Sequence, residues 1–412
     1  MAKKVEIPAL DLKREYDFLR KDIARELRSC FESQQWILGE KVTQFEEKAA
    51  KYLGVKHAIG VASGTDALLL SLRALAIKEK NKEYFDKKDE VITTPFTFVA
   101  TAEAIVRSGA TPVFVDVNLA TFNICPKEIK KAITKNTVGI LPVHLYGNPC
   151  QMDEILKIAK ENNLFVVEDT AQAFGGTYST KGGSLPCRQA GASGGKGKKL
   201  GTIGNCGAFS FFPSKNLGGC GDGGLIATNN IRLAELVRIL RNHGQIKKYN
   251  ASYIGYNSRL DSIQAAILLV KLKYVDKFNQ LRREIAKKYN EAFKDIKQLQ
   301  TPKPLTINHQ PSTINQQPST INYGHVYHLY TIKVTSGRDE LLKFLNSSGI
   351  DTRPYYPILL SKMKAFKNCK IKGDLKNAKD LSKKILSLPI HPFLKDEEID
   401  YVISTVKKFF KK

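Results

Sequence analysis

The stretch GAFSFFPSKNLGG, residues 207–219, sets a single lysine, Lys215, among aromatic side chains, a proline and glycines. A partly desolvated amine loses its proton more readily than a solvated one and becomes a nucleophile. Lys215 could therefore hold an aldehyde as a Schiff base, and the hydroxyl of Ser210 could reach a phosphate on the same molecule. Because a lysine in a glycine-rich loop can also be simply solvated, this hypothesis needs supporting residues elsewhere in the chain.

The length and composition predict a globular protein. A chain of 412 residues can bury a full hydrophobic core and favours two domains. No apolar run is long enough to span a membrane, and the first residues lack the apolar centre of a signal peptide. We therefore expect a cytoplasmic protein without a membrane partner.

The net charge of +25 raises the question of an acidic partner. The lysines are spread along predicted helical faces rather than gathered in one arm, which indicates solvated surfaces. The chain contains no zinc-finger spacing, RNA-recognition signature or basic zipper, so we expect no nucleic-acid partner. A basic surface would still favour an anionic substrate such as a nucleotide sugar.

The seven cysteines are dispersed, odd in number and without a Cys-x-x-Cys pair. This pattern argues against a disulfide framework and against a structural zinc site. We expect reduced thiols and no bound metal.

Strand patterns alternate with helical patterns over the first part of the chain. The runs HAIGVA (57–62), TPVFVDV (111–117) and LFVVED (164–169) each read as a strand close to an amphipathic helix. This alternation predicts an α/β fold with a mostly parallel central sheet covered by helices. Ligands bind such sheets outside the carboxyl ends of the strands. Five candidate residues lie at or just after such ends: Thr65, Phe98, His144, Asp169 and Gln172.

The turn Ser63-Gly64-Thr65 connects the first of these strands to a helix that begins near Asp66. The N-terminus of a helix offers free backbone N–H groups and the positive end of its dipole, which suit a phosphate. An ordinary capped helix is the alternative, because serine, threonine and aspartate are all good caps.

We expect a large domain over residues 1–258 and a smaller α+β domain over residues 259–412. Two segments interrupt the pattern. Residues 180–198 are rich in glycine and basic side chains and should form a flexible surface loop. Residues 306–322 repeat the sequence TINHQPS with a period of seven, and because its prolines exclude a helix and its polar residues cannot bury a core, we expect a disordered insert without a catalytic role.

Several motifs occur in one order along the chain: ASGTDAL (62–68), TPFTFVATAEAI (94–105), VEDTAQAFGG (167–176), FSFFPSKNLG (209–218) and NSRLDSIQAAIL (257–268). This ordered set resembles the DegT/DnrJ/EryC1/StrS family of nucleotide-sugar aminotransferases, which depend on pyridoxal 5′-phosphate (PLP). The resemblance extends from about residue 7 to the C-terminal helix and is broken only by the two inserts. It implies the aspartate-aminotransferase-like architecture, PLP fold type I.

The resemblance also implies roles for the matching residues. Lys215 would bind PLP as an aldimine and move a proton during turnover, when the cofactor passes through pyridoxamine phosphate. Asp169 would pair with the pyridine nitrogen, Phe98 would stack on the ring, and Gln172 would lie near the 3′ oxygen. The residues that would hold the phosphate are Gly64, Thr65 and Ser210.

Each of these side chains has an alternative that involves no cofactor. Asp169 could cap a helix or be solvated, Phe98 could belong to the core, and Gln172 could lie on a helix surface.

In enzymes of this family an asparagine from the neighbouring subunit completes the phosphate site, and Asn257 matches it. The resemblance therefore implies a homodimer with shared active sites. Arg259 could bind an acidic group of the substrate or form a structural salt bridge. Tyr355 and Tyr356, in PYYPILL, would contact the sugar, and Tyr355 stands where related enzymes carry histidine.

TTPFTFVATAEAI (93–105), HGQIKKY (243–249) and SLPIHPFL (387–394) are similar to enzymes that aminate C3 of UDP-2-acetamido-2-deoxy-3-oxo-glucuronate for surface-glycan synthesis, with L-glutamate as amino donor. A dTDP-3-keto- or 4-keto-6-deoxyhexose is the alternative acceptor. Sugar dehydratases of the same fold carry histidine at the position of Lys215, which argues against dehydration. A cofactor-free regulatory or nucleic-acid-binding protein is the alternative from another class.

Overall fold

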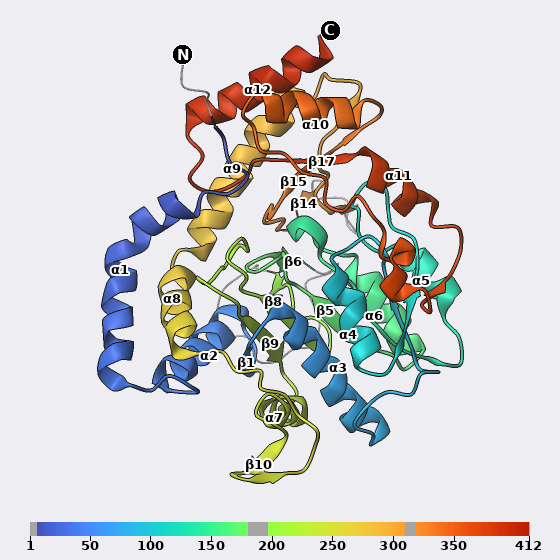
Figure 1. Cartoon of the computed structure of the whole chain (residues 1–412). Coiled ribbons are helices and arrows are strands. Elements are labelled where there is room, and N and C mark those ends of the chain that lie inside the picture. Colours follow the sequence, from blue (N-terminus) through green and yellow to red (C-terminus); the bar gives the residue numbers. More distant parts are fainter. Residues whose placement is uncertain (1–5, 180–196, 310–318, 323, 412) are drawn as a thin grey trace.

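The central sheet of the computed structural model has eight strands (Figure 1). The structure describes residues 6–179, 197–309, 319–322 and 324–411. β9 runs antiparallel to both of its neighbours, and every other neighbouring pair in this sheet is parallel. In spatial order the strands are β1 (His57–Val61), β9 (Gly224–Thr228), β8 (Cys206–Ser210), β5 (Phe165–Asp169), β4 (Thr137–Ile140), β2 (Glu90–Thr93), β3 (Thr111–Phe114) and β16 (Lys370–Ile371). The predicted α/β fold with a mostly parallel sheet is confirmed.

Helices cover both faces of this sheet, because successive side chains of each strand point to opposite faces. On β5, Phe165 and Val167 face one core cluster and Val166 faces another. The first cluster is shared with α3 (Gly64–Lys80), α4 (Val99–Arg107) and α7 (Ile231–Leu240). The second is shared with α5 (Pro126–Ala132) and α6 (Met152–Glu161).

A smaller antiparallel sheet of β12 (Leu299–Gln300), β15 (Tyr330–Val334) and β17 (Ile385–Leu388) forms the centre of a second core. It packs with the C-terminal half of α9 (Val275–Phe293), with α10 (Arg338–Ser347) and with α12 (Asp396–Phe410). Figure 1 shows these elements together at the top of the molecule.

α8 (Ser262–Leu272) packs against α1 (Leu12–Ser33) and α2 (Glu40–Leu53), and its Leu268 shares a cluster with Phe209 of β8. We therefore propose a domain boundary within α9, later in the chain than the expected division after residue 258.

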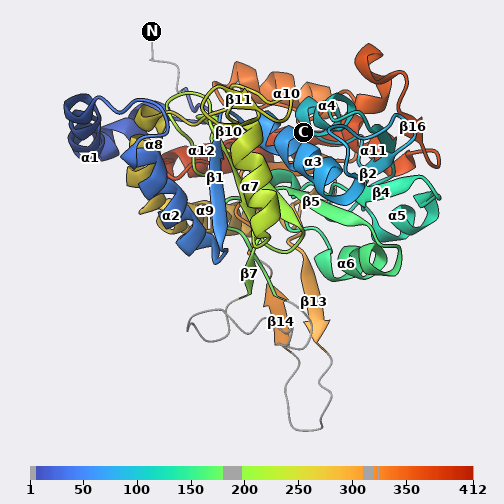
Figure 2. The same cartoon turned by 90° about the horizontal axis from the view of Figure 1, so that it is seen from below.

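The described ends of the two inserts, which include β7, β13 and β14, lie on the same side of the molecule (Figure 2). β13 (Thr306–His309) pairs antiparallel with β14 (Ser319–Asn322), so both ends of the seven-residue repeat differ from the expected disorder. The β-branched threonine and isoleucine in each copy favour this extended pairing. β6 (Thr177–Tyr178) pairs with β7 (Lys198–Lys199) at the base of the other insert. The expected flexibility of residues 180–196 and disorder of 310–318 concern segments outside the described residues.

The remaining elements are short apart from α11. They are η1 (Leu145–Gly147), β10 (Gln245–Lys247), β11 (Asn250–Ala251), η2 (Leu360–Lys362), η3 (Lys364–Phe366) and α11 (Lys376–Lys384). Among the described residues, no helix combines the length and the apolar character that a bilayer crossing requires.

Candidate active site

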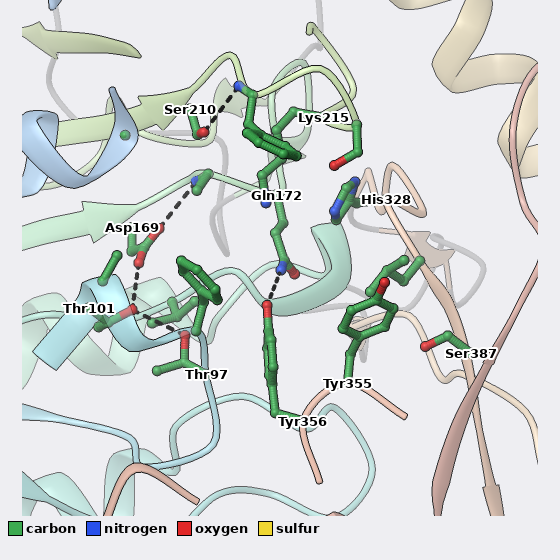
Figure 3. A pocket seen from close by; sticks show the side chains of 18 of the residues that line it. Thr97, Thr101, Asp169, Gln172, Ser210, Lys215, His328, Tyr355, Tyr356 and Ser387 are labelled. Carbon is green, nitrogen blue, oxygen red and sulfur yellow. Dashed lines mark hydrogen bonds between the residues drawn. The ribbon is translucent and has the colours of Figure 1, made fainter. Parts of the chain in front are cut away.

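A cavity of about 510 Å³ lies at the carboxyl ends of β5 and β8 (Figure 3). The strand-end rule places ligands at this edge of a parallel sheet. Nine of the expected site residues line the cavity: Gly64, Thr65, Phe98, Asp169, Gln172, Ser210, Lys215, Tyr355 and Tyr356. Asn257 and Arg259 do not line it.

Lys215 follows the end of β8 in a tight turn. Its backbone N–H donates to the carbonyl of Phe212 at 2.8 Å, and Gly219 donates to Phe211 at 2.7 Å, which folds the glycine-rich segment back on itself. Burial lowers the pKa of Lys215 to about 8, and the charge of Asp169 partly offsets this effect. About a tenth of Lys215 is therefore an uncharged amine at pH 7, far more than for a solvated lysine, and a nucleophile or proton acceptor must be uncharged.

Asp169, at the end of β5, is 5% exposed. Its Oδ2 accepts a hydrogen bond from the Thr101 hydroxyl at 2.8 Å, and its Oδ1 accepts one from the Ala171 N–H at 3.2 Å (Figure 3). Burial raises the pKa of Asp169, and the two hydrogen bonds and the charge of Lys215 counter that rise. The carboxylate is neither solvated nor saturated, so it has room for one more donor such as a protonated ring nitrogen.

The turn after β1 forms a cradle for an anion. The Ser63 hydroxyl caps α3 by accepting from the Asp66 N–H at 3.0 Å. Among the described residues, the N–H groups of Gly64 and Thr65 make no hydrogen bond. A Cβ on Gly64 would lie 2.6 Å from the Cβ of Ser210, so only glycine permits this close approach of the two chain segments. The free N–H groups and the hydroxyl of Ser210 fit a phosphate.

Gln172 joins three parts of the cavity wall. Its Oε1 accepts from the Tyr146 N–H at 2.6 Å, and its Nε2 donates to the Tyr356 hydroxyl at 3.1 Å. The Tyr146 hydroxyl in turn donates to the carbonyl of Tyr355. Gln172 is buried, so it is not a helix-surface glutamine.

Phe98 is 54% exposed and its ring centroid lies 6.2 Å from that of Tyr356. An aromatic side chain of the core would be buried, so Phe98 instead presents its ring to the cavity. This position suits stacking on a planar ligand.

Asn257 and Arg259 lie outside the cavity of this chain. Asn257 is exposed and its backbone bridges to Asn242. Arg259 donates to the Asn242 side chain at 3.0 Å, and its Nε is buried without a partner. The salt bridge that was the alternative role of Arg259 does not form among the described residues.

Four further side chains of the cavity wall come from the second core, and the strand-end rule did not predict them. They are Arg282, His328, Arg353 and Ser387. Figure 3 shows His328 and Ser387 across the cavity from Asp169 and Thr101. No local pattern distinguishes these positions, because only the packing of the second core on the first brings them to the cavity.

Glu168, next to Asp169, points to the opposite face of the sheet and is fully buried. Its carboxylate accepts N–H bonds from Gly201 (2.9 Å), Ile203 (2.7 Å) and Gly204 (2.7 Å), and His144 Nε2 lies 3.0 Å away. Because the Nδ1 of His144 accepts from the Cys150 N–H at 3.1 Å, the ring is neutral and its Nε2 donates to Glu168. His144 therefore lies with Glu168 on the face of the sheet opposite Asp169. Through Glu168 it helps to fix residues 201–204, which lead into β8.

Because four hydrogen-bond donors surround the Glu168 carboxylate, we predict that Glu168→Gln strongly destabilises the folded protein. The amide NH₂ would face at least one of these donors, and His144 cannot change tautomer without losing the Cys150 bond. We expect the free energy of unfolding to fall by about 2–4 kcal/mol. Urea unfolding measures this fall, with Glu154→Gln at an exposed site as control. Equal unfolding midpoints for both variants would contradict the role of Glu168.

The lowered pKa of Lys215 predicts early deprotonation. At pH 8 about half of the Lys215 amines should be neutral, against roughly 0.4% for a solvated lysine. Trace acetylation of the cofactor-free protein over pH 6–11, read by peptide mass spectrometry, should therefore give a midpoint for Lys215 well below that of the exposed Lys160. A shared midpoint would show that Lys215 is not desolvated.

The profile of the DegT/DnrJ/EryC1/StrS aminotransferase family matches residues 17–407. A pleiotropic regulatory protein of Geobacillus stearothermophilus is 40% identical, covering 98% of this chain and 99% of that protein. The UDP-N-acetyl-3-dehydro-alpha-D-glucosamine 3-aminotransferase of Acidithiobacillus ferrooxidans is 36% identical, covering 99% of each. The crystal structure of DesV from S. venezuelae, in complex with a ketimine intermediate, has a TM-score of 0.86 at 35% identity and 99% coverage of each chain. The chain therefore belongs to the DegT/DnrJ/EryC1/StrS aminotransferase family and is a PLP-dependent sugar aminotransferase.

Proposed function

We propose that Lys215 carries PLP and that the protein transfers the amino group of L-glutamate to a keto sugar of a nucleotide sugar. The observation that carries this proposal is the pair of Lys215 and Asp169 in one cavity. Desolvation moves the pKa of the amine down and that of the carboxyl group up. Two titratable groups with opposite shifts in one cavity are typical of a catalytic site.

The residues of the cavity fit PLP. When bound, PLP supplies an electron sink for the carbanion that forms next to the transferred nitrogen. The N–H groups of Gly64 and Thr65 and the hydroxyl of Ser210 would hold its phosphate, and Phe98 would cover one face of its ring. Asp169 would accept a hydrogen bond from the protonated ring nitrogen and keep that proton in place.

Lys215 has the remaining chemical role. As a neutral amine it can attack an aldehyde carbon, and after its release it can take a proton from the donor carbon and return it. Thr101 would keep the Asp169 carboxylate oriented, while Gln172 would hold Tyr356 at the sugar side of the cavity.

For the acceptor we propose UDP-2-acetamido-3-keto-glucuronate, aminated at C3. A UDP-2-acetamido-2-deoxy-3-oxo-D-glucuronate aminotransferase of Pseudomonas aeruginosa is 34% identical, covering 97% of this chain and 99% of that protein. The alternative is a dTDP-3-keto- or 4-keto-6-deoxyhexose, and a dTDP-3-amino-3,6-dideoxy-alpha-D-galactopyranose transaminase of Aneurinibacillus thermoaerophilus is 39% identical, covering 98% and 99%. The names of these two relatives and of the Acidithiobacillus ferrooxidans enzyme all place the nitrogen or the keto group at C3, which supports amination at that carbon.

We further propose a homodimer in which Asn257 reaches the phosphate site of the neighbouring subunit. The exposed position of Asn257 supports this. The residues just before Asn257 are fixed by the fully buried Arg73. Its guanidinium donates to the Tyr256 hydroxyl at 2.6 Å and to the Ile254 carbonyl at 3.0 Å. A rigid support for an exposed asparagine is what a shared site needs.

The acceptor is tested by incubating the PLP-loaded protein with L-glutamate and a panel of 3-keto and 4-keto nucleotide sugars. We expect mass spectrometry to find an aminated product with the 3-keto uronate and none with Lys215→Met. Amination of a dTDP sugar alone would select the alternative acceptor. A deoxygenated product, or none from any sugar, would refute the proposed transfer.

The shared site is tested by mixing two inactive variants, Lys215→Met and Asn257→Ala, and refolding them together. Half of the dimers would be mixed, and one of the two sites in each would be intact, so about a quarter of the wild-type activity should return. If each site is built from one chain, the mixed sample should be no more active than either variant refolded alone.

A further inference from the structure

Arg282, in the middle of α9, is 3% exposed and lines the cavity that also holds Lys215. Its Nε and Nη1 are fully buried and make no hydrogen bond. Among the described residues no carboxylate forms an ion pair with Arg282. The carboxylate whose charge reaches it, Glu15, is already paired with Lys271.

A buried guanidinium without a partner is rare, because a charge removed from water is stabilised only by an opposite charge or by hydrogen bonds. Burial lowers the pKa of Arg282 to about 10, so the side chain still carries its charge at neutral pH. The unsatisfied N–H groups are therefore available to an anion that enters the cavity.

The surroundings of Arg282 contain further unused polar atoms. His328 lines the cavity with a buried Nδ1 that has no partner, and both ring nitrogens of the buried His391 are also without one. Arg282 and His328 line the same cavity, and the charge of Arg282 lowers the pKa of His328 and that of His391. Burial is the larger cause in each case and keeps the two rings neutral.

The other cations of the cavity wall each have an assigned counter-charge, while the acidic Asp222 would repel an anion rather than bind it. Lys215 and Asp169 face each other's charge, and Arg353 pairs with Asp351 at 3.1 Å. The phosphate cradle lies at the N-terminus of α3, which is a different element. Arg282 is thus the unpaired cation among the described cavity residues that no cofactor group requires.

We propose that Arg282 binds a substrate carboxylate, with His328 as a further polar side chain in the wall of the same cavity. A guanidinium offers parallel N–H groups that fit a carboxylate with two hydrogen bonds. The inference rests on the proposed function, in which the amino donor and the acceptor occupy one cavity in turn. Two sources share this chemistry: the carboxylate of L-glutamate and the carboxylate of a uronic acid.

Three variants test the role of Arg282. Arg282→Met removes the charge and keeps an unbranched side chain that reaches as far as the Nε of arginine, while Arg282→Lys keeps the charge and loses the two parallel N–H groups. Arg283→Met is the matched control, since Arg283 is the next residue of α9, bonds to Gln280 and does not line the cavity.

The first measurement is the melting temperature of the PLP-loaded protein with and without glutarate, a dicarboxylate that lacks an amino group. Glutarate should raise the melting temperature of the wild type and of Arg283→Met, because a ligand that binds only the folded state stabilises it. It should have no effect on Arg282→Met. Without glutarate, Arg282→Met should melt at or above the wild-type temperature, because an unpaired buried charge has been removed.

The second measurement separates the two half-reactions. If Arg282 binds the amino donor, Arg282→Met should raise the KM for L-glutamate about 30-fold or more, with little change for the nucleotide sugar. If it binds the acceptor, the KM should rise for the keto uronate and stay constant for its neutral 3-keto analogue. In that case glutarate binds as a mimic of the uronate, and either result supports the proposal.

The proposal is overturned if Arg282→Met keeps both the glutarate effect and all KM values. It is also overturned if Arg282→Met melts well below the wild type while Arg282→Lys restores that temperature without glutarate binding, since this pattern marks a structural charge. Absence of any aminated sugar from the wild type would instead refute the proposed function, and the glutarate measurement would still decide the role of Arg282.

Discussion

The buried carboxylate of Glu168 is the constraint on which the site depends. It sits one residue before Asp169, and side chains of a strand alternate between faces, so anchoring Glu168 on one face aims Asp169 into the cavity on the other. It accepts hydrogen bonds from Gly201, Ile203 and Gly204, which lie in the segment that leads into β8. The same carboxylate therefore fixes β5 and the start of the strand that delivers Lys215. A buried charge is stable here because four N–H donors surround it.

Desolvation is the common cause of the electrostatics in the cavity. It disfavours every charged form, so it lowers the pKa of Lys215 and raises that of Asp169. Mutual attraction limits both shifts, and the Thr101 hydroxyl adds further stabilisation to the ionised carboxylate. The two shifts bring the pKa values of the amine and the carboxyl group closer together than they are in water. The helix N-terminus that carries Gly64 adds a fixed positive potential for a phosphate.

The first core and the cavity residues that it contributes could be predicted from sequence because their signals are local. Strand periodicity placed Asp169 and Gln172 at a strand end, and the turn before α3 marked Gly64 and Thr65. Arg282 and His328 carry no such signal, because a helix and a loop of the second core bring them to the cavity only through packing. Asn257 was predicted only from the family resemblance, because its proposed partner is another chain and no pattern in this chain indicates that contact. At the repeat, composition argued for disorder, whereas the Thr-Ile-Asn ends pair as β13 and β14.

The described ends of each insert form a short strand pair, and the two inserts also contact each other, but neither contributes a described residue to the cavity wall. Thr177 bridges to Gly324, and no described residue of β6, β7, β13 or β14 lines the cavity. The chain that returns from the repeat is then fixed at once: Val326 donates to Gly147 at 3.1 Å and His328 donates to Tyr146 at 2.9 Å. Tyr146 is the residue whose N–H binds Gln172. These backbone hydrogen bonds therefore lie between the described ends of the inserts and His328, and they connect the returning chain to the wall that Gln172 and Tyr356 form.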